Sequence, residues 1–466
     1  MKKIVLIFIG LWQILPAYAQ DWQQVGDFND RSPACFYSDT VDEFLYIGGF
    51  FLSVGPDTMY GICRWDGQQF YSMGDVHKKQ CGNFCNPISM ITRYHNEIYI
   101  GGTIDTINGE NTNGIAKWNG IAWSTVGNNP YPHHPTDYWI FSSYIKDDKL
   151  YVTGKFPTAG TDSCNSVAYW DGTDWYGMNF PADIGGYVPK NFSIEFYNGE
   201  WYVGGNCYNE IDGQINHDIL RYDGVSWKQV GEGLKGGISF INDMIVYKDE
   251  LYICGYFRSA DGNAGNKIMR WDGETWHDVG GGACGDYNLS KMMVYNDKLY
   301  VVGIFSCMGN DLPVSNVATW DGERWCSLGN SYFNNTIIAI TAWKGDIYVC
   351  GGFTEVGGYP VKNFAKYVGD QSATTCTVVA APEPKETAQL KITPNPALAT
   401  IDIKGSAQDG VPEFIRVFDM AGRECSAFAD LARAGSTIDI HRLPPGLYFV
   451  QLQYAHKLAG GRFVKM

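Results

Sequence analysis

The sequence lacks long hydrophobic runs beyond its first residues and is poor in basic charge. After residue 19 no apolar stretch approaches the roughly 20 residues that a membrane-spanning helix needs. The 466 residues include 35 Lys and Arg against 50 Asp and Glu, so the formal net charge is -15 at pH 7. Because nucleic acids and anionic membranes repel such a chain, we expect neither as a partner.

Motifs of catalysis and of metal binding are also absent. There is no Gly-x-Ser-x-Gly turn, no His-Glu-x-x-His helix, no phosphate-binding glycine loop and no zinc-type Cys and His spacing. We therefore expect no enzyme and no cofactor. Calcium stays open, because Asp212-Gly213 and Asp261-Gly262-Asn263 carry suitable oxygen atoms, although turns explain these segments equally well.

The first residues have the pattern of a secretory signal. Lys2 and Lys3 precede the apolar run Ile4–Leu15, and Ala17-Tyr18-Ala19 forms a small-x-small cleavage site. We expect residues 1–19 to be removed near Ala19 and the mature chain to be exported, which permits disulfides among its 13 cysteines.

Glycine and aromatic residues, by contrast, are abundant and recur in two motifs. An aliphatic-Tyr-aliphatic-x-Gly motif has its tyrosines at positions 46, 99, 151, 202, 252, 300 and 348. About twenty residues later comes Trp-Asp-Gly or a close variant, followed by another aromatic residue, as in Trp271-Asp272-Gly273 with Trp276. The period of about 50 residues predicts seven copies of one structural unit.

Each unit is expected to form four antiparallel strands, which in the second copy are residues 88–94, 97–102, 114–118 and 122–127. The Asp-Gly step predicts a type I′ hairpin turn, in which both central residues need positive φ. We therefore expect the repeated aspartates to shape turns rather than to catalyse; they are Asp66, Asp171, Asp223, Asp272 and Asp321.

The two ends of the repeat region are expected to share one unit. The seventh copy stops near Tyr367, before its fourth strand, and residues 22–26 match the missing segment in type and spacing. Pairing this N-terminal strand with the last unit closes a ring and removes exposed edges, which a linear solenoid would not need. The predicted fold is all-β: a seven-bladed β-propeller of four-stranded antiparallel blades over residues 20–370.

The two motifs resemble the kelch-like repeats of bacterial surface proteins and fungal cortical polarity markers, whose units carry Leu-Tyr-Val-x-Gly-x-Phe and Trp-Asp-Gly-x-x-Trp. The resemblance spans about residues 22–370. It implies the propeller fold and says little about activity, because propellers carry many functions.

Residues 371–389 are rich in Thr, Ala, Pro and Glu and are interpreted as a linker. Beyond them, strands are expected at 390–392, 401–403, 414–419, 437–440 and 447–453, which fit a small immunoglobulin-like β-sandwich over residues 390–466. An ordinary adhesion-type sandwich is one interpretation of this tail.

Several ordered motifs of the tail resemble instead the C-terminal sorting domain of the bacterial type IX secretion system. The residues that carry the resemblance are Pro394, Asn395, Pro396, Asp419, Gly422, Arg423, Gly446, Tyr448 and Lys465. The resemblance implies the type IX secretion machinery as a partner, and release or attachment at the outer cell surface.

A propeller would place the connections between units on one face, where function concentrates. Aromatic and amide groups there suit a glycan or protein ligand. The candidate ligand residues are Phe84, Tyr131, His133, His134, Tyr138, Trp139, Tyr187, Tyr287, Tyr332 and Phe333. We expect one disulfide between Cys284 and Cys307, which flank the sixth unit, and a local one between Cys81 and Cys85.

Three functions follow from these observations. The first is a noncatalytic binding or adhesion propeller, and the second is a secreted polysaccharide- or peptide-degrading enzyme with its site in the inter-blade loops. The third is a structural surface-layer component. Short O-glycosylation-like motifs suggest the third; they are Asp39-Thr40-Val41, Asp57-Thr58-Met59 and Asp105-Thr106-Ile107.

Overall fold

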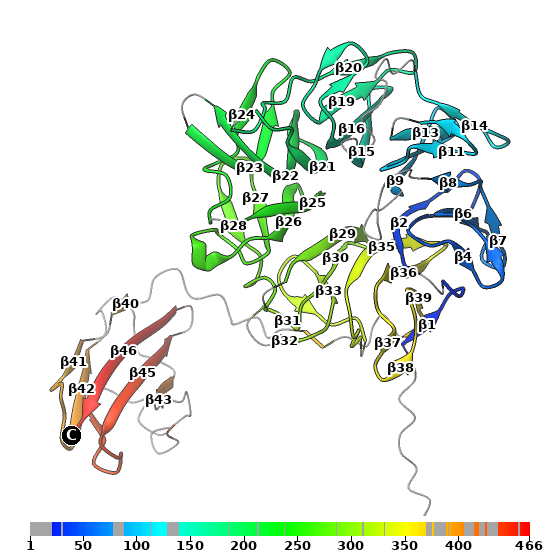
Figure 1. Ribbon diagram of the computed structural model, residues 1–466. Helices are drawn as coiled ribbons and strands as arrows, with labels where there is room; N and C mark the ends of the chain where they lie inside the picture. The colour runs from blue at the N-terminus through cyan, green and yellow to red at the C-terminus, as the bar shows by residue number, and fades with distance from the viewer. Residues whose placement is uncertain are drawn as a thin grey trace, which may run out of the picture. The chain divides into compact units, whose positions relative to one another are not determined.

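The computed structural model consists of two compact units, residues 1–377 and 378–466 (Figure 1). The signal segment, residues 1–19, lies outside the described residues. These are 21–28, 31–77, 88–112, 114–127, 139–184, 186–211, 214–236, 238–285, 287–309, 312–329, 331–369, 375–376, 388–389, 391–404, 414–418, 425, 437–454 and 457–466.

The fold is all-β. The one helical element in the described part of the chain is the 3-10 turn Ser259–Asp261. Within these ranges no helix is long and apolar enough to cross a bilayer.

Four-stranded antiparallel sheets recur along unit 1, and we number them in chain order and name their strands from first to fourth. Sheet 1 is β2 (Pro33–Ser38), β3 (Leu45–Gly49), β6 (Ile62–Trp65) and β7 (Phe70–Ser72); sheet 2 is β9 (Ile88–Tyr94), β10 (Glu97–Gly102), β13 (Ile115–Trp118) and β14 (Trp123–Thr125); sheet 3 is β15 (Trp139–Lys146), β16 (Lys149–Lys155), β19 (Val167–Trp170) and β20 (Trp175–Gly177).

The remaining sheets of unit 1 have the same strand order. Sheet 4 is β21 (Lys190–Tyr197), β22 (Glu200–Ile211), β23 (Gln214–Tyr222) and β24 (Trp227–Gln229); sheet 5 is β25 (Phe240–Tyr247), β26 (Glu250–Tyr256), β27 (Ile268–Trp271) and β28 (Trp276–Asp278); sheet 6 is β29 (Leu289–Tyr295), β30 (Lys298–Gly303), β33 (Val317–Trp320) and β34 (Trp325–Cys326); sheet 7 is β35 (Ile337–Trp343), β36 (Asp346–Gly351), β39 (Phe364–Tyr367) and β1 (Trp22–Gln24).

Short two-residue strands lie in the connections between the strands of these sheets. They are β4 (Ser53–Val54), β5 (Asp57–Thr58), β8 (Val76–His77), β11 (Thr106–Ile107), β12 (Glu110–Asn111), β17 (Thr158–Ala159), β18 (Asp162–Ser163), β31 (Cys307–Met308), β32 (Leu312–Pro313), β37 (Glu355–Val356) and β38 (Tyr359–Pro360).

The repeated aliphatic-Tyr-aliphatic-x-Gly motif forms the second strand of each sheet in unit 1. The side chains of this motif are buried between neighbouring sheets, and the hydrophobic core lies there. All five residues of β3 are buried, and the tyrosines at 46, 99, 202 and 348 are among the largest fully buried side chains. Apolar clusters join consecutive sheets, and one of them combines Leu45 of sheet 1 with Tyr348 of sheet 7. In Figure 1 the outer strands β14, β20, β24 and β28 lie at the periphery of unit 1.

The turn chemistry differs from the sequence prediction. In the Asp-Gly hairpins only the glycine has positive φ, as at Gly273 (φ 107), and Asp272 Oδ1 accepts the backbone N–H groups of Glu274 and Thr275 at 2.7 Å each. The type I′ assignment is therefore wrong, because the aspartate side chain caps its own loop in an Asx turn. Two consecutive positive-φ residues occur instead between first and second strands, as at His95 and Asn96.

Sheet 7 is assembled from both ends of unit 1. Trp22, Gln23 and Gln24 of β1 pair antiparallel with Tyr367, Lys366 and Ala365 of β39. Trp22 is fully buried, and its ring lies 5.1 Å from those of Phe333 and Tyr367.

The second unit has two sheets. One has the order β40 (Ala388–Gln389), β46 (Lys457–Lys465), β45 (Gly446–Tyr454) and β43 (Phe414–Phe418), and the other has the order β41 (Lys391–Thr393), β42 (Thr400–Lys404) and β44 (Thr437–Asp439). The sequence prediction omits β40 and β46, and β40 pairs parallel with β46 rather than antiparallel.

Candidate ligand-binding cavity

Each first strand of unit 1 carries one extra residue near its start. In sheet 5, Ile241 pairs with Gly255 and Asp243 with Cys254, so Asn242 is bulged out of the ladder. The same register shift recurs in every sheet of unit 1, where the bulged residues are Ala34, Ser89, Phe141, Phe192, Asn242, Ser290 and Ile338. A bulge bends its strand and redirects a side chain.

The glycine of the repeated motif makes the bulge sterically feasible. A Cβ on Gly255 would lie 2.1 Å from the carbonyl oxygen of Phe240, and one on Gly351 would lie 2.1 Å from that of Thr336. Gly154, Gly205 and Gly303 meet the backbone before the bulge in the same way. The motif therefore needs glycine because the first strand passes too close for a side chain.

All of these bulged residues line one cavity of about 440 Å³. Because the bulges lie at the starts of the first strands, the cavity lies at the end of the sheets where the connections between sheets enter. Its volume is within the range of about 300–1,000 Å³ that small-ligand sites occupy.

The polar part of the cavity wall comes from sheets 5 and 6. Lys291 Nζ lies 2.6 Å from Asp243 Oδ1, and the other Asp243 oxygen accepts the backbone N–H of Met292 at 2.8 Å. Burial acts to lower the pKa of Lys291, but the Asp243 carboxylate outweighs it and raises that pKa, so the ammonium stays charged. Asn242 Nδ2 donates to the carbonyl of Leu289 at 2.7 Å.

The apolar part of the wall is largely aromatic. Phe141 and Phe192 meet edge to face with 4.9 Å between ring centroids, and Trp139 lies 5.5 Å from Phe141. Ile338 and Phe36 continue this surface from sheets 7 and 1.

Of the ligand residues predicted from the sequence, none of the five that the structure describes lines this cavity. Tyr187, Tyr287 and Tyr332 are exposed on connections between sheets, and Trp139 contacts the cavity-lining Phe141. Phe333 is a core residue and not a surface contact, because it is 4% exposed and packs against Trp22 and Phe353. The others lie outside the described residues; they are Phe84, Tyr131, His133, His134 and Tyr138.

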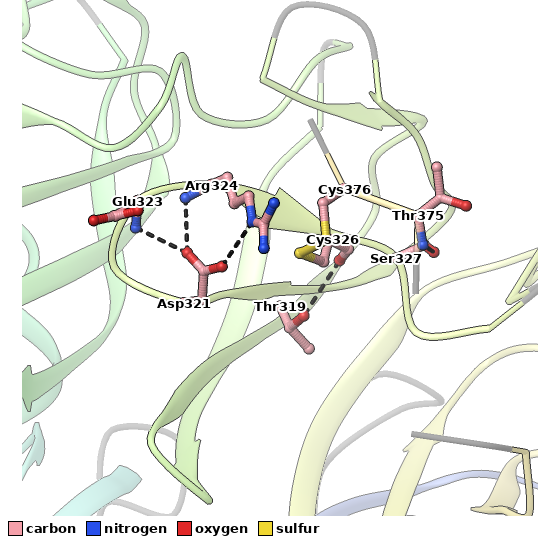
Figure 2. Close-up of a disulfide and its surroundings, with 8 residues drawn as sticks. All are labelled: Thr319, Asp321, Glu323, Arg324, Cys326, Ser327, Thr375 and Cys376. Carbon is pink, nitrogen blue, oxygen red and sulfur yellow. Dashed lines mark hydrogen bonds and ion pairs between the residues drawn. A yellow bond between two sulfur atoms is a disulfide. The ribbon is translucent and has the colours of Figure 1, made fainter. Parts of the chain in front are cut away.

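Two disulfides occur in the described part of unit 1. One joins Cys284 to Cys307, the pair that the sequence predicts, while Cys81 and Cys85 lie outside the described residues. The other joins Cys326 of β34 to Cys376, within the segment interpreted as a linker (Figure 2). Beside it, Ser327 N donates to Thr375 O at 2.7 Å, so residues 375 and 376 extend the outer edge of sheet 6.

Two buried carboxyl groups have raised pKa values. Burial raises the pKa of Asp218 to about 7, and both its oxygens are occupied, one by Ser239 Oγ at 2.5 Å and one by Cys207 N at 3.1 Å. Burial also raises the pKa of Glu195 on β21 to about 7. Asp218 is 2% exposed, so it reaches no substrate from solvent.

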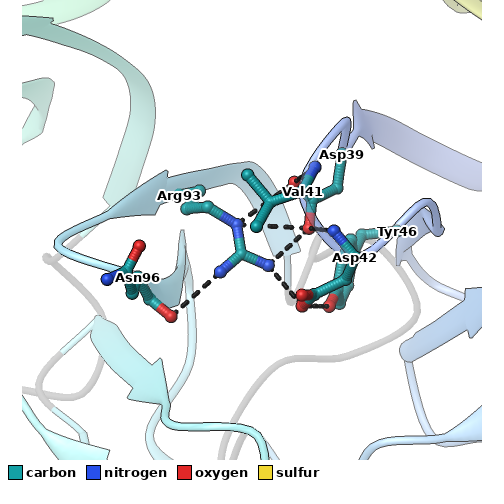
Figure 3. Close-up of polar contacts among 6 residues, drawn as sticks. All are labelled: Asp39, Val41, Asp42, Tyr46, Arg93 and Asn96. Carbon is teal, nitrogen blue, oxygen red and sulfur yellow. Dashed lines mark hydrogen bonds and ion pairs between the residues drawn. The ribbon is translucent and has the colours of Figure 1, made fainter.

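Asp39, in one of the O-glycosylation-like motifs, is a buried ion-pair partner. Arg93 Nε lies 3.1 Å from Asp39 Oδ1, and the same guanidinium binds Asp42 and the carbonyl of Asn96 (Figure 3). These contacts join sheets 1 and 2. Thr40 and Thr58 are exposed, whereas Thr106 is buried.

Asp261-Gly262-Asn263 is explained as a turn. Asn263 Oδ1 accepts the Lys235 N–H at 2.8 Å, and its amide donates to the carbonyls of Lys235 and Arg258. Asp212 and Gly213 lie outside the described residues. Within the described ranges no group of three or more His, Cys, Asp or Glu side chains could hold a metal ion.

In the second unit several described residues of the sorting-type motifs contact or belong to the last strand, β46. Asn395 Nδ2 donates to Arg462 O at 3.1 Å, and Asn395 Oδ1 accepts the Val464 N–H at 2.9 Å. Thr393-Pro394 and Asn395-Pro396 are cis. Gly446 pairs with Lys465, and Tyr448 stacks on Phe463 at 5.5 Å. Asp419, Gly422 and Arg423 lie outside the described residues.

A family model described as secretion system C-terminal sorting domain matches residues 391–465. The tail is therefore a sorting domain of the type IX kind, which directs the protein to the cell surface or the medium. No curated protein matches the chain.

Three solved structures are similar to the chain at low identity. The designed protein Ika8 is 13% identical with a TM-score of 0.39, and the match covers 81% of this chain and 94% of that one. The extracellular domain of a protein described as a one-component system from B. thetaiotaomicron is 10% identical (TM-score 0.22; 96% and 99% covered). An α-L-arabinofuranosidase from Clostridium thermocellum is 14% identical (TM-score 0.23; 62% and 95% covered).

Proposed function

We propose that unit 1 is a closed, kelch-like seven-bladed β-propeller and that it acts as a noncatalytic binding module. Its ligand, a glycan or a protein, would be held at the end of the sheets where the connections between blades enter. The signal peptide would be removed near Ala19, and the type IX tail would direct the mature protein out of the cell.

Contacts between sheets 7 and 1 support the closure. The first strands β35 and β2 contact each other, as the first strands of consecutive sheets do. Trp343 of sheet 7 lies 5.2 Å from Trp65 of sheet 1, and Asn363 Nδ2 donates to the carbonyl of Phe28 at 2.6 Å. Asn316 of sheet 6 makes the equivalent bond to Phe333 O at 3.2 Å.

A second repeated bond supports the place of β1 as a fourth strand. The indole N–H of Trp325 donates to Val279 O of the preceding sheet at 2.8 Å, and that of Trp227 donates to Met178 O at 2.8 Å. Trp22 donates to Ser331 Oγ at 2.6 Å, and Ser331 in turn bonds to Leu328 O at the end of sheet 6.

The single observation that carries the binding function is the convergence of the bulges. Each first strand departs from the regular ladder at one residue, and all of these residues line the same cavity. Bulges cost regular hydrogen bonds and are common beside functional sites.

An enzyme is the second candidate, and the raised pKa of Glu195 favours it, because a general acid works best with a pKa near the operating pH. Glu195 would then be the acid of a polysaccharide- or peptide-degrading site, and that site would lie apart from the wall of the cavity, which does not include Glu195. Against this, Asp218 is buried and fully hydrogen-bonded, so it supplies no second accessible carboxylate.

One experiment separates the two functions. The purified mature protein is applied to arrays of glycans and of matrix proteins, and each ligand it binds is then incubated with it to measure released sugar or peptide. We expect binding without turnover. Turnover that disappears in Glu195→Gln would establish the enzyme instead, and an absence of binding on every array would remove the binding function.

A further inference from the structure

We infer that the cavity of unit 1 binds the end of a neutral carbohydrate chain. The inference rests on the proposed binding function and adds the site, the ligand class and the direction of entry. Three observations lead to it: the charge balance of the wall, the hydrogen-bonding groups that remain available there, and the aromatic surface opposite them.

The charge balance disfavours ionic ligands. Lys291 is the one charged side chain among the described residues that line the cavity, and its ammonium lies 2.6 Å from Asp243 Oδ1. The Asp243 side chain is 5% exposed and that of Lys291 is 42% exposed, so the pair lies at the boundary with solvent and leaves the wall with no net charge. An anionic ligand would have to compete with Asp243 for Lys291, inside a protein whose net charge is -15.

The available polar groups include both donors and acceptors. The Lys291 ammonium has three N–H groups, of which one faces Asp243, so two can donate to a ligand. The Asn242 amide donates one N–H to Leu289 O, and its carbonyl oxygen can accept a hydrogen bond from a ligand. Ser290 adds a hydroxyl that donates and accepts. Sugar hydroxyls, which also do both, fit this mixture better than a group that only donates or only accepts.

The aromatic side supplies the complementary surface. Phe141 and Phe192 come from sheets 3 and 4, whereas Asn242, Ser290 and Lys291 come from sheets 5 and 6. A pyranose ring has a face of C–H groups and an edge of hydroxyls, so it can pack on phenyl rings while its edge meets the polar wall. Because strands from every sheet of unit 1 surround the cavity, a linear polymer enters it end-on.

The test uses the full mature protein and isothermal titration calorimetry. The probes are cellotriose, xylotriose, mannotriose and lactose as neutral sugars, sialyllactose as an anionic sugar and Gly-Gly-Gly as a peptide. Ser290→Phe fills the cavity without removing a core contact, and Ser290→Ala removes only the hydroxyl at the same position. Asn242→Ala removes an acceptor from the wall, and Tyr187→Ala alters an exposed residue on a connection between sheets, outside the cavity lining.

We expect at least one neutral sugar to bind, with at least tenfold weaker affinity in Ser290→Phe and Asn242→Ala. Tyr187→Ala should keep the affinity, Ser290→Ala should weaken it less than Ser290→Phe does, and a cooperative thermal transition in every variant verifies folding. If Tyr187→Ala loses affinity and the cavity variants do not, the cavity site is wrong while the binding function stands. If sialyllactose or the peptide binds more tightly than the neutral sugars, and the cavity variants weaken that binding, the inferred ligand class is wrong. Failure of every probe in the folded wild type overturns the carbohydrate inference, and the protein arrays then decide the binding function separately.

Discussion

At the scale of single residues, two neighbouring glycines of sheet 7 differ in what a side chain would meet. A Cβ on Gly351 would lie 2.1 Å from the carbonyl oxygen of Thr336 and 2.9 Å from the Cα of Ile337. On Gly352 the nearest atom is a methyl group of Thr336 at 3.7 Å, which is an ordinary contact. Neither glycine has positive φ. A difference between their alanine variants would therefore come from the close approach of neighbouring atoms and not from backbone strain.

We therefore predict that Gly351→Ala lowers the free energy of unfolding by at least about 2 kcal/mol, because the bulged strand must move away from the new methyl group. Gly352→Ala should change it by less than about 0.5 kcal/mol. Urea denaturation followed by tryptophan fluorescence measures both. Equal effects of the two substitutions would show that the bulge does not depend on the glycine.

Asp218 and Asp223 of sheet 4 are a pair of carboxyl groups shifted in opposite directions. Burial raises the pKa of Asp218 to about 7, above the unfolded value of about 3.9. The folded state therefore binds this proton more tightly, and the free energy of unfolding falls as pH rises from about 4 to about 7. For the partly exposed Asp223 the Lys228 ammonium and backbone N–H groups lower the pKa, so its contribution is lost as pH falls below about 4.

Asp218→Asn should accordingly gain stability relative to the wild type as pH rises from 5 to 8, by about 1.4 kcal/mol for each pH unit until the folded pKa of about 7 is reached. Asparagine suits the backbone, since Asn316 and Asn363 occupy the equivalent positive-φ positions. Asp223→Asn should show the same stability deficit at pH 5 and at pH 8, because the folded and unfolded pKa values of Asp223 both lie below this range. Urea titrations at both pH values provide the measurement, and parallel pH curves for the two variants would contradict the assigned shifts.

At the scale of elements, the outer edge of sheet 6 is extended by residues from beyond sheet 7. Cys376 is joined to Cys326 of β34, and Thr375 N also donates to Ser327 Oγ at 3.0 Å. The two cysteines are 50 residues apart, and the loop between them contains β35, β36 and β39 of sheet 7. The disulfide therefore lowers the conformational entropy that the segment forming β35, β36 and β39 has in the unfolded state.

From loop length, the double variant Cys326→Ser with Cys376→Ser should lose about 4 kcal/mol of stability. The Cys284 and Cys307 pair, 23 residues apart, is the comparison and should contribute about 3 kcal/mol. Thermal unfolding without reductant ranks the two double variants. Peptide mapping of the wild type that finds Cys376 as a free thiol would refute the tether.

The strands could be predicted from the sequence because apolar alternation is local. In sheet 2, residues 88–94 and 97–102 are strands as predicted, and the four-stranded antiparallel arrangement is confirmed. The cavity could not be predicted in this way. A bulge is a property of the register between two strands, and residues as different as Ala34, Phe192 and Asn242 occupy the bulged position. The one sequence signal was the repeated glycine, which the bulge requires.

The tail shows the same division between local and non-local information. Alternation predicts β42 and β45, but β46 begins with Lys457 and contains Gly460 and Gly461, which weaken a strand pattern. Its strand character depends on pairing with β45 along its whole length. Cys376 was missed for a similar reason, since a Thr-rich, aperiodic segment gives no hint of its partner 50 residues earlier.

At the scale of the whole molecule, the proposed closure makes the two ends of unit 1 neighbours in one sheet. Trp22 is paired with Tyr367 as Trp276 is paired with Trp271, and the latter pair is joined by the four residues Asp272–Thr275. Val368 N also donates to Asp21 O at 2.8 Å. A short hairpin copied from sheet 5 should therefore connect the ends without strain.

The corresponding permutant begins at residue 31, continues to Tyr367, and is followed by Asp-Gly-Glu-Thr and residues 22–28. The reference is residues 21–369 in native order, and Cys326→Ser is present in both because Cys376 is absent. We expect the permutant to fold with a melting temperature equal to or above that of the reference, because β1 is now tethered to β39. Trp22→Ala should cost about 3–5 kcal/mol in both chains, since the indole fills the same site. A permutant that aggregates while the reference folds would mean that β1 does not complete sheet 7 in solution, and the ring would then be open.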